Sequence, residues 1–277
     1  MDASSRIEAP PGGWIEPYAG LAYKPRQMAV EAATEHRALR LCGIDPDVFG
    51  DAVDPSTFIS YAIQEGVRNG VHANGTVNMA QRLVQRDKLR LGERLTVTGT
   101  IHTVEEVPRG KVAVSETWFA GADGRPGVMS GRRSLRPDPA KVEARGAGTR
   151  IAPIVDNPLA LRVLGEVALT PANVVAYDSE GVNPIHSDPD AARRAGFRAP
   201  IIGGGMGVRF LTAAIWRRFA PVGIELDIQF RRPIFWDDSL EIRVDERDGE
   251  WRAICLVKDG KVATEAAIAG LTPGARV

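Results

Sequence analysis

The stretch "VVAYDSEGVNPIHSDPDAARRAGFRAPIIGGGMG", Val174–Gly207, places a histidine and a glycine cluster between predicted helices. Before it, Thr170-Pro171 is a helix-capping pair, a hydroxyl followed by proline at the first helical position, which predicts a short helix through Tyr177. "SDPDAARRAG" predicts a second helix, and "MGVRFLTAAIWRRF" predicts a third helix after the glycines. In the third helix Met206, Phe210, Ala213, Ala214 and Arg217 share a face.

His186 is therefore expected in a loop between two helices. A histidine there can act as a general base, because its unperturbed pKa lies near neutrality. A glycine cluster at a helix start exposes backbone N–H groups and a positive dipole end, which suits a developing oxyanion. A surface histidine and a tight turn are the simpler explanations of each feature taken alone.

The stretch resembles the signature of MaoC-like (R)-specific enoyl-CoA hydratases and dehydratases. That pattern runs from an aromatic residue through Ser-Gly-Asp-x-Asn-Pro-Ile-His to Gly-Phe, Pro-Ile and His-Gly-Met. Matching positions here are Tyr177, Ser179, Asn183, Pro184, Ile185, His186, Gly196, Phe197, Pro200 and Ile201. The resemblance implies a double hotdog fold, in which each repeat wraps a curved antiparallel sheet around a long helix. It implies activity on an acyl-CoA thioester.

The same resemblance assigns roles to residues. His186 would be the base and Asn183 its orienter, and Gly204 or Gly205 would donate a backbone N–H to the thioester oxygen. Tyr177, Ser179, Met206 and Arg231 are expected at the substrate, Arg231 as one of several arginines that could contact coenzyme A phosphates.

Two positions depart from the pattern. Gly181 stands where the family has its aspartate, and Gly203 or Gly204 stands where it has the histidine of His-Gly-Met. Glu180 or Asp178 could supply the missing carboxylate, His72 of the N-terminal half could supply the charge, or the site could have lost hydration activity.

The two halves of the chain match each other. Gln85–Ile101 aligns with Phe230–Glu246 at a constant offset of 145 residues. In both segments basic residues are followed by a turn, an acidic residue, a leucine and then a strand with alternating apolar positions. This indicates a duplicated α+β unit. We expect an N-terminal arm (1–25), a degenerate N-terminal repeat (26–137), a linker (138–160) and a C-terminal repeat with the motif (161–277).

Local patterns predict further elements in both halves. Arg26–Ile44 is rich in helix formers, and Asp54-Pro55 resembles a helix start. "RLTVTGTIHTVEEV", "KVAVSETWFAGADGRPGVMSGRRSL", "SLEIRVDER", "EWRAICLV" and "VATEAAIAGL" predict strands, with hairpin turns at Asp123-Gly124 and Asp259-Gly260.

Bulk composition narrows the classes of protein. The formal net charge of zero gives no argument for binding nucleic acid or an acidic membrane. Cys42 and Cys255 have neither a CxxC pair nor a histidine cluster nearby, so we expect free thiols and no metal site. The absence of a long apolar run or a signal-like start predicts a cytoplasmic protein. No nucleotide fingerprint follows a strand, so no cofactor is expected beyond the coenzyme A of the substrate.

The favoured hypothesis is a hydratase or dehydratase that adds water reversibly to a trans-2-enoyl-CoA. The alternative is a catalytically silent acyl-CoA-binding or scaffold protein that kept the fold. Gly181 favours the alternative, whereas intact Asn183 and His186 favour the enzyme. Thioester hydrolysis is a third possibility, ranked lower because it places its carboxylate differently. A monomer and a homodimer are both compatible with the sequence.

Overall fold

A single ten-stranded antiparallel sheet forms one side of the molecule in the computed structural model, which describes residues 12–73, 75–141, 151–178 and 183–274. The strand order is β1-β3-β4-β5-β2-β7-β10-β9-β8-β6. The strands are β1 (Arg26–Met28), β2 (Val77–Gln85), β3 (Leu95–Val107), β4 (Gly110–Ala120), β5 (Pro126–Pro137), β6 (Arg162–Ala168), β7 (Gly223–Phe230), β8 (Ser239–Arg247), β9 (Glu250–Lys258) and β10 (Lys261–Thr272).

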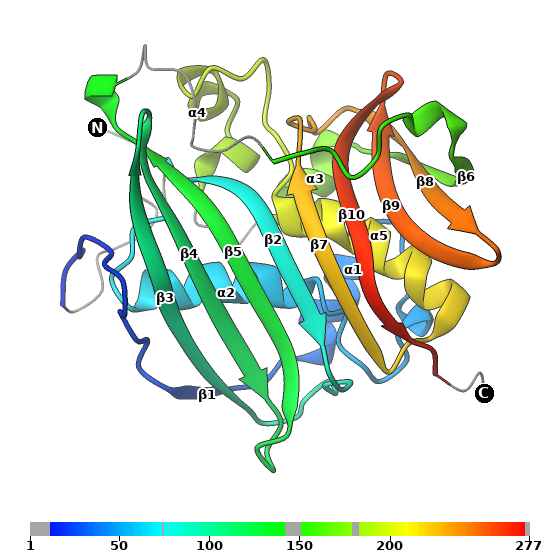
Figure 1. The fold of residues 1–277 in the computed structure, drawn as a ribbon, viewed down its shortest axis with the longest axis horizontal. Helices are drawn as coiled ribbons and strands as arrows, with labels where there is room; N and C mark the ends of the chain where they lie inside the picture. Colours follow the sequence, from blue (N-terminus) through cyan, green and yellow to red (C-terminus); the bar gives the residue numbers. More distant parts are fainter. Residues whose placement is uncertain (1–11, 74, 142–150, 179–182, 275–277) are drawn as a thin grey trace.

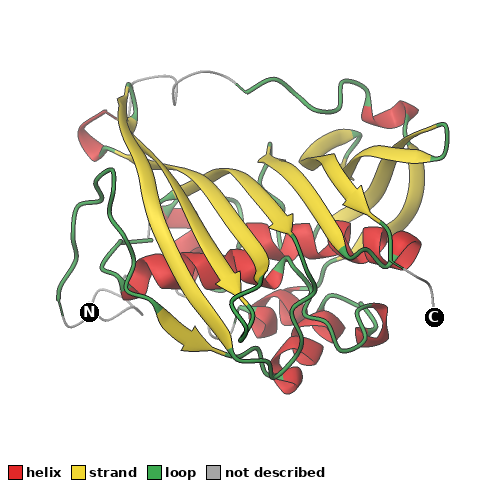
Figure 2. Cartoon of the chain, turned by 60° about the horizontal axis from the view of Figure 1, so that its bottom comes forward, coloured by secondary structure: helices red, strands yellow, loops and turns green. Residues whose placement is uncertain are grey.

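The helices lie on the other side, with α2 and α5 running beneath the curved sheet and the shorter helices beyond them (Figures 1 and 2). The α-helices are α1 (Ala32–Leu41), α2 (Thr57–Arg68), α3 (Pro171–Tyr177), α4 (Pro189–Arg194) and α5 (Gly204–Phe219). Four 3-10 turns complete the described elements: η1 (Pro46–Val48), η2 (Pro139–Lys141), η3 (Pro158–Ala160) and η4 (Pro184–His186).

The internal duplication predicted from the sequence is present in the sheet. Each half contributes five adjacent strands in equivalent order, β1-β3-β4-β5-β2 and then β7-β10-β9-β8-β6, and β2 pairs with β7 at the centre. In that central register Arg82 lies opposite Asp227, its own counterpart at the offset of 145. The two repeats are therefore related by an approximate twofold axis through this pair.

Several local predictions are confirmed. Leu95, Val97, Gly99 and Ile101 are the buried positions of β3, as their alternation indicated. The hairpin between β9 and β10 turns at Asp259 and Gly260, both with positive φ (48° and 71°). Glycine is the residue that adopts such φ values without steric cost, and Asp tolerates them.

The helix predicted over Arg26–Ile44 is only partly correct. Arg26–Met28 forms the edge strand β1, in register with Leu95–Val97 of β3, and the helix begins at Ala32. Backbone pairing with β3 outweighs the weak helical preference of this short segment. Gly43, with φ of 65°, follows the end of α1 as predicted.

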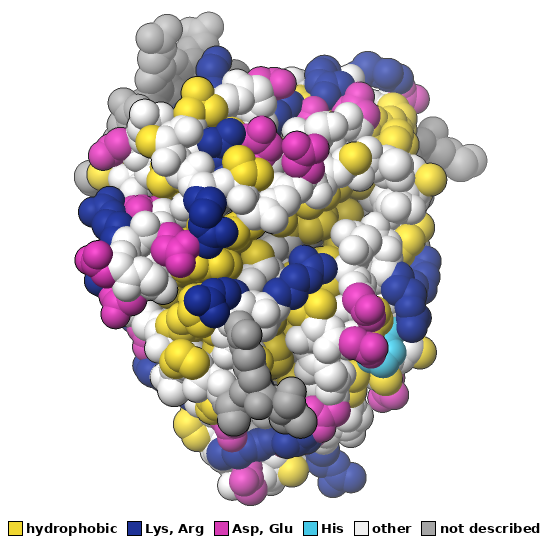
Figure 3. Space-filling view, turned by 90° about the vertical axis from the view of Figure 1, so that its right-hand side faces the viewer, with side chains coloured by type: hydrophobic (Ala, Val, Ile, Leu, Met, Phe, Trp, Pro, Cys, Tyr) yellow, Lys and Arg dark blue, Asp and Glu magenta, His cyan; other side chains and the backbone are white. Residues whose placement is uncertain are grey.

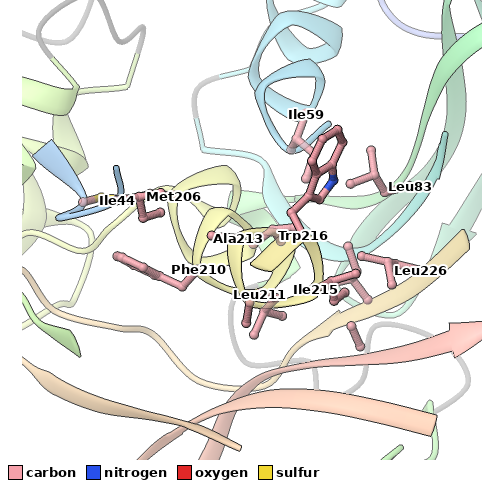
Figure 4. Close-up of a cluster of buried hydrophobic side chains, with 14 of the residues drawn as sticks. Ile44, Ile59, Leu83, Met206, Phe210, Leu211, Ala213, Ile215, Trp216 and Leu226 are labelled. Carbon is pink, nitrogen blue, oxygen red and sulfur yellow. The ribbon is translucent and has the colours of Figure 1, made fainter. Parts of the chain in front are cut away.

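Helix α5 is buried on all sides at the centre of the core. Every residue from Gly205 to Trp216 is buried, a pattern typical of a helix enclosed by its own domain. Met206 and Phe210 leave α5 on the side of Ile44, whereas Trp216 extends toward Ile59 and Leu83 of the N-terminal repeat (Figure 4). A single core thus joins both repeats.

The expected arm and linker both pack on the sheet where they are described. In the arm, Leu21 and Tyr23 are 9% and 7% exposed and cluster with Ile101. In the linker, Val155 clusters with Cys255 and Val257 on the face of β9 opposite the core residues Ile254 and Leu256. Residues 142–150 of the linker lie outside the described residues.

Candidate active site

His186 is the only histidine of the sequence motif, and the structure fixes its tautomer. The residue lies in η4, is half-buried, and has Nδ1 2.8 Å from the carbonyl oxygen of Ile201. Because a carbonyl oxygen only accepts hydrogen bonds, Nδ1 must carry the ring proton. Burial lowers the pKa of His186 below 6.5, and the Ile201 bond offsets this in part. The imidazole is therefore neutral at pH 7, with a free lone pair on Nε2.

Nε2 faces the start of α5. A Cβ placed on Gly203 would lie 4.0 Å from this nitrogen, and among the described residues beyond the chain neighbours of Gly203 no other atom would be within 4 Å of that Cβ. A side chain at position 203 would thus approach the base, and glycine avoids this. His186 therefore lies beside Gly203, the N-cap of α5.

The N–H groups of Gly204 and Gly205 lie at the first turn of α5. The N-cap Gly203 supplies no side-chain acceptor, and the first backbone bonds to that turn start at Met206 and Gly207, which donate to the Gly203 carbonyl. The N–H groups of a helix's first turn have no intrahelical acceptor and carry a positive partial charge. Gly204 and Gly205 are therefore suitable donors to a developing oxyanion beside His186.

Steric contacts explain why glycine occupies two of these positions. A Cβ on Gly204 would lie 2.8 Å from Cζ of Phe230, so a larger residue would displace that ring. A Cβ on Gly205 would lie 3.1 Å from Oγ of Ser60, an exposed residue of α2. Ser60 and Gly205 are counterparts at the offset of 145, so the site lies where the two repeats meet.

The N-terminal repeat does not reproduce this site. At the offset of 145, Phe58 and Ile59 stand where the C-terminal repeat has Gly203 and Gly204, and they are 0% and 1% exposed. Their side chains fill the equivalent space with core packing. His72, considered as a charge donor, stacks against Trp14 at a ring-centroid distance of 4.4 Å.

Asn183 acts through the backbone rather than on the imidazole ring in this structure. Its Oδ1 accepts from the N–H of Ile185 at 3.3 Å and caps η4, while the ring bonds to Ile201. Pro184 occupies the first position of η4, where the φ angle fixed by the proline ring suits a helical turn. Asn183 thus shapes the turn that carries His186, and Ile201 orients the ring.

Tyr177 lies at the end of α3 beside the fully buried Arg209. The Arg209 guanidinium lies 5.7 Å from the ring centroid and donates a hydrogen bond to the phenol oxygen. Burial raises the pKa of Tyr177 to about 12, so the phenol stays protonated. Arg209 in turn contacts Glu35 and Asp54, which anchors the helix before the motif to the N-terminal repeat.

The other predicted site residues are not seen at the proposed site in the part of the chain that the structure describes. Ser179, Glu180 and Gly181 lie outside the described residues, and Asp178 is the C-cap of α3 directly before them. The Met206 side chain is 1% exposed in the core, so it is not available to a ligand in this structure.

Arg231 is occupied by partners within the protein. Its Nε lies 2.8 Å from Oε1 of Glu265, and its Nη1 donates to the carbonyl of Ile151 at 3.1 Å. These partners, Glu265 of β10 and Ile151 of the linker, are not residues of the proposed site at His186. Sequence reasoning missed Ser60 and Phe230, although the offset of 145 pairs Ser60 with Gly205.

The described residues contain neither a candidate metal site nor a membrane-spanning helix. Within them, no group of three or more His, Cys, Asp or Glu residues is arranged to hold a metal ion. None of the helices described combines the length and the apolar character needed to span a bilayer.

Comparisons with known proteins agree with this geometry. The protein HtdX of Mycobacterium tuberculosis superposes with a TM-score of 0.72 at 19% identity, over 89% of this chain and 98% of that chain. A MaoC-like dehydratase from Phytophthora capsici gives 0.67 at 15% identity, over 90% and 95%. A second M. tuberculosis protein, described as having a double hotdog fold, gives a TM-score of 0.57 at 13% identity, over 93% of this chain and 98% of that chain.

These likenesses define the class of protein: the chain has the double hotdog fold. The family model described as MaoC like domain matches residues 160–267, which contain the motif and α5. The C-terminal repeat of the chain therefore contains a MaoC-like domain, and the match supports an enzyme of the hydratase or dehydratase type. A search of the curated proteins found no match.

Proposed function

We propose that the C-terminal repeat adds water reversibly to the double bond of a trans-2-enoyl-CoA. One observation carries the proposal: the imidazole of His186, fixed by Ile201, presents an unprotonated Nε2 beside Gly203, the N-cap of α5. The N–H groups in the first turn of that helix have no intrahelical acceptor. A base and an oxyanion donor set so placed are the two requirements of a conjugate addition to a thioester.

The reaction balances with these groups. Nε2 of His186 takes a proton from water, and the water oxygen forms a bond to C3 of the enoyl group. The electron pair of the C2–C3 double bond moves onto the thioester oxygen, where the N–H groups of Gly204 or Gly205 stabilise the charge. The imidazolium then returns the proton to C2, which gives the 3-hydroxyacyl thioester.

Besides the imidazole of His186, a carboxylate would hold the attacking water. Asp178 and Glu180 remain the candidates from the sequence, since Gly181 occupies the position of the family's aspartate. The Glu180→Gln and Asp178→Asn variants locate this group, because only the variant that loses the water-holding carboxylate should lose about 10²–10⁴-fold in kcat/KM. The chemistry requires neither a metal nor a redox cofactor.

The test uses a panel of trans-2-enoyl-CoA esters of increasing chain length, followed by loss of the enoyl absorbance. His186→Ala should lower kcat/KM by about 10²–10⁴-fold. His102→Ala is the matched control, because His102 lies on β3 with its side chain 47% exposed and should leave turnover unchanged. Equal background rates in the wild type and His186→Ala on every ester would refute the catalytic proposal.

The second candidate is a silent acyl-CoA-binding protein, which Gly181 favours. It predicts that crotonyl-CoA binds without conversion, and that His186→Ala leaves the dissociation constant unchanged. Calorimetric titration together with analysis of the recovered ester distinguishes the two candidates.

A further inference from the structure

A cavity lies on the outer side of α5, away from His186. It has a volume of about 540 Å³ and is lined by the C-terminal half of α5, the edge strand β6 and the C-terminal end of α1. Figure 3 looks onto this side of the molecule and shows an apolar hollow with Lys and Arg side chains around it. Cavities of this volume accommodate small organic ligands.

The cavity is distinct from the proposed active site. Its lining includes Phe210, Ala213, Ala214 and Arg217 but neither His186 nor any residue from Gly203 to Gly205. At 1.5 Å per residue, Arg217 lies about 21 Å along the helix from Gly203. The small side chains of Ala213 and Ala214 leave the room that the ligand would occupy.

The walls combine apolar surface with excess positive charge. Ile44, Leu164 and Val167 contribute apolar side chains, and the lining contains three arginines, Arg162, Arg217 and Arg218, against one carboxylate, Glu166. Arg162 is engaged by Glu246, with Nε 2.9 Å from Oε2.

Arg217 is the cation available to a ligand. It is exposed in the last turn of α5 and makes no hydrogen bond or ion pair with any residue that the structure describes. A guanidinium beside an apolar wall favours a ligand that joins an alkyl chain to an anionic head.

Trp251 supplies a second, independent polar feature. Its side chain lines the cavity and is 5% exposed, yet its indole N–H has no hydrogen-bond partner among the described residues. Phe219 packs edge-on against the ring at 5.1 Å. A buried donor without a partner is unfavourable, so an acceptor oxygen on a bound ligand would be favoured here.

We infer that this cavity binds an amphipathic carboxylate of the free fatty acid class. The alkyl chain lies along Ala213, Ala214 and Phe210 between α5 and β6. The carboxylate lies at the rim, within reach of the Arg217 guanidinium. This site is separate from the proposed hydratase site, and the inference stands whether or not the proposed function does.

The test is calorimetric titration with sodium decanoate and with 1-decanol, which has the same chain without the charge. The wild type should bind one decanoate per chain. Arg217→Ala should weaken decanoate binding about tenfold and leave decanol binding unchanged. Arg252→Ala is the matched control, since Arg252 is a 60%-exposed arginine of β9 outside the cavity lining, and it should change neither titration.

A cavity-filling variant gives a second measurement. Ala214→Trp should abolish binding of both ligands, while an unchanged circular dichroism spectrum shows that the fold persists. His186→Ala should retain full decanoate affinity.

Three outcomes would overturn the inference. The first is the absence of saturable decanoate binding to the wild type. The second is binding that survives both Arg217→Ala and Ala214→Trp, or that is lost in His186→Ala, because the ligand would then occupy another site. The third is a dimer that Ala214→Trp converts to a monomer in sedimentation velocity, because a second copy would then cover the cavity.

Discussion

Replacing Arg209 with methionine should lower the free energy of unfolding by about 3–5 kcal/mol, because it leaves two buried carboxylates without a counter-charge. The side chains of Arg209, Glu35 and Asp54 are 2%, 2% and 0% exposed. Nη1 of Arg209 lies 3.0 Å from Glu35 and 3.5 Å from Asp54, and Nη2 lies 3.3 Å from the second Glu35 oxygen. Methionine preserves much of the volume but none of these contacts.

The matched control is Arg193→Met. Arg193 and its partner Asp190 are 62% and 70% exposed on α4, so the loss of this pair should cost less than about 1 kcal/mol. The difference between the two variants isolates the effect of burial on the same chemical change. A loss of 3–5 kcal/mol corresponds to a fall in Tm of about 6–20 °C for a chain of this size.

The assay is urea unfolding followed by circular dichroism at pH 7 and at pH 5. Burial raises the pKa of Asp54, and the Arg209 guanidinium opposes that rise. Without Arg209 the folded-state pKa of Asp54 rises further above its unfolded value of 3.8. The folded state then binds more protons than the unfolded state, so the stability deficit of Arg209→Met should shrink as the pH falls from 7 to 5.

Two results would refute this reasoning. One is an Arg209→Met variant within about 0.5 kcal/mol of Arg193→Met at pH 7. The other is a deficit that grows on acidification, since that would mean the buried carboxylates are not the source of the cost.

Three further predictions concern the site and the thiols. Because burial lowers the pKa of His186 from 6.5, the fall of kcat/KM on acidification should have its midpoint below pH 6.5; a midpoint above 6.5 in the pH profile contradicts this. Gly204→Ala should displace the Phe230 ring and lower kcat more than tenfold in steady-state assays. Gly196→Asn is the control and should leave kcat unchanged, because no described atom beyond its chain neighbours lies within 4 Å of a Cβ at that turn. Burial raises the pKa of Cys42 and Cys255 to about 12, so iodoacetamide at pH 8 should label neither thiol until urea unfolds the chain. Rapid labelling of the native protein would contradict this prediction.

The helices around the motif could be predicted because their signals are local. The Thr170 hydroxyl accepts from the N–H of Asn173, and Asp188 accepts from the N–H groups of Asp190 and Ala191. Capping residues act within one helical turn, so their pattern can be identified from the sequence without knowledge of the tertiary structure.

The central strands were not predicted, for two different reasons. In β7, Ile224, Leu226 and Ile228 are 1%, 0% and 2% exposed, so an alternating pattern was present and was overlooked. In β2 the buried positions include the polar residues Gln81 and Gln85, which obscure any alternation. Their burial depends on β5 and on the opposite repeat, because Gln81 donates to Ser130 and Gln85 donates to Val222.

The site was predictable in its chemistry but not in its contacts. His186 and the glycines were identified from the motif, yet the partner that orients the ring is a backbone carbonyl 15 residues away at Ile201. Backbone carbonyls carry no sequence signature. Ser60 reaches the site only because the folded repeats bring the starts of α2 and α5 together.

The pairing of Ser60 with Gly205 has an evolutionary consequence. Two identical subunits must encode every interfacial crevice with one sequence, so any change appears twice. Once the copies share one polypeptide, each half can diverge alone. Phe58 and Ile59 could then fill the space in one half while Gly203 and Gly204 stayed small in the other, which leaves a single asymmetric site where an ancestral dimer would have had two.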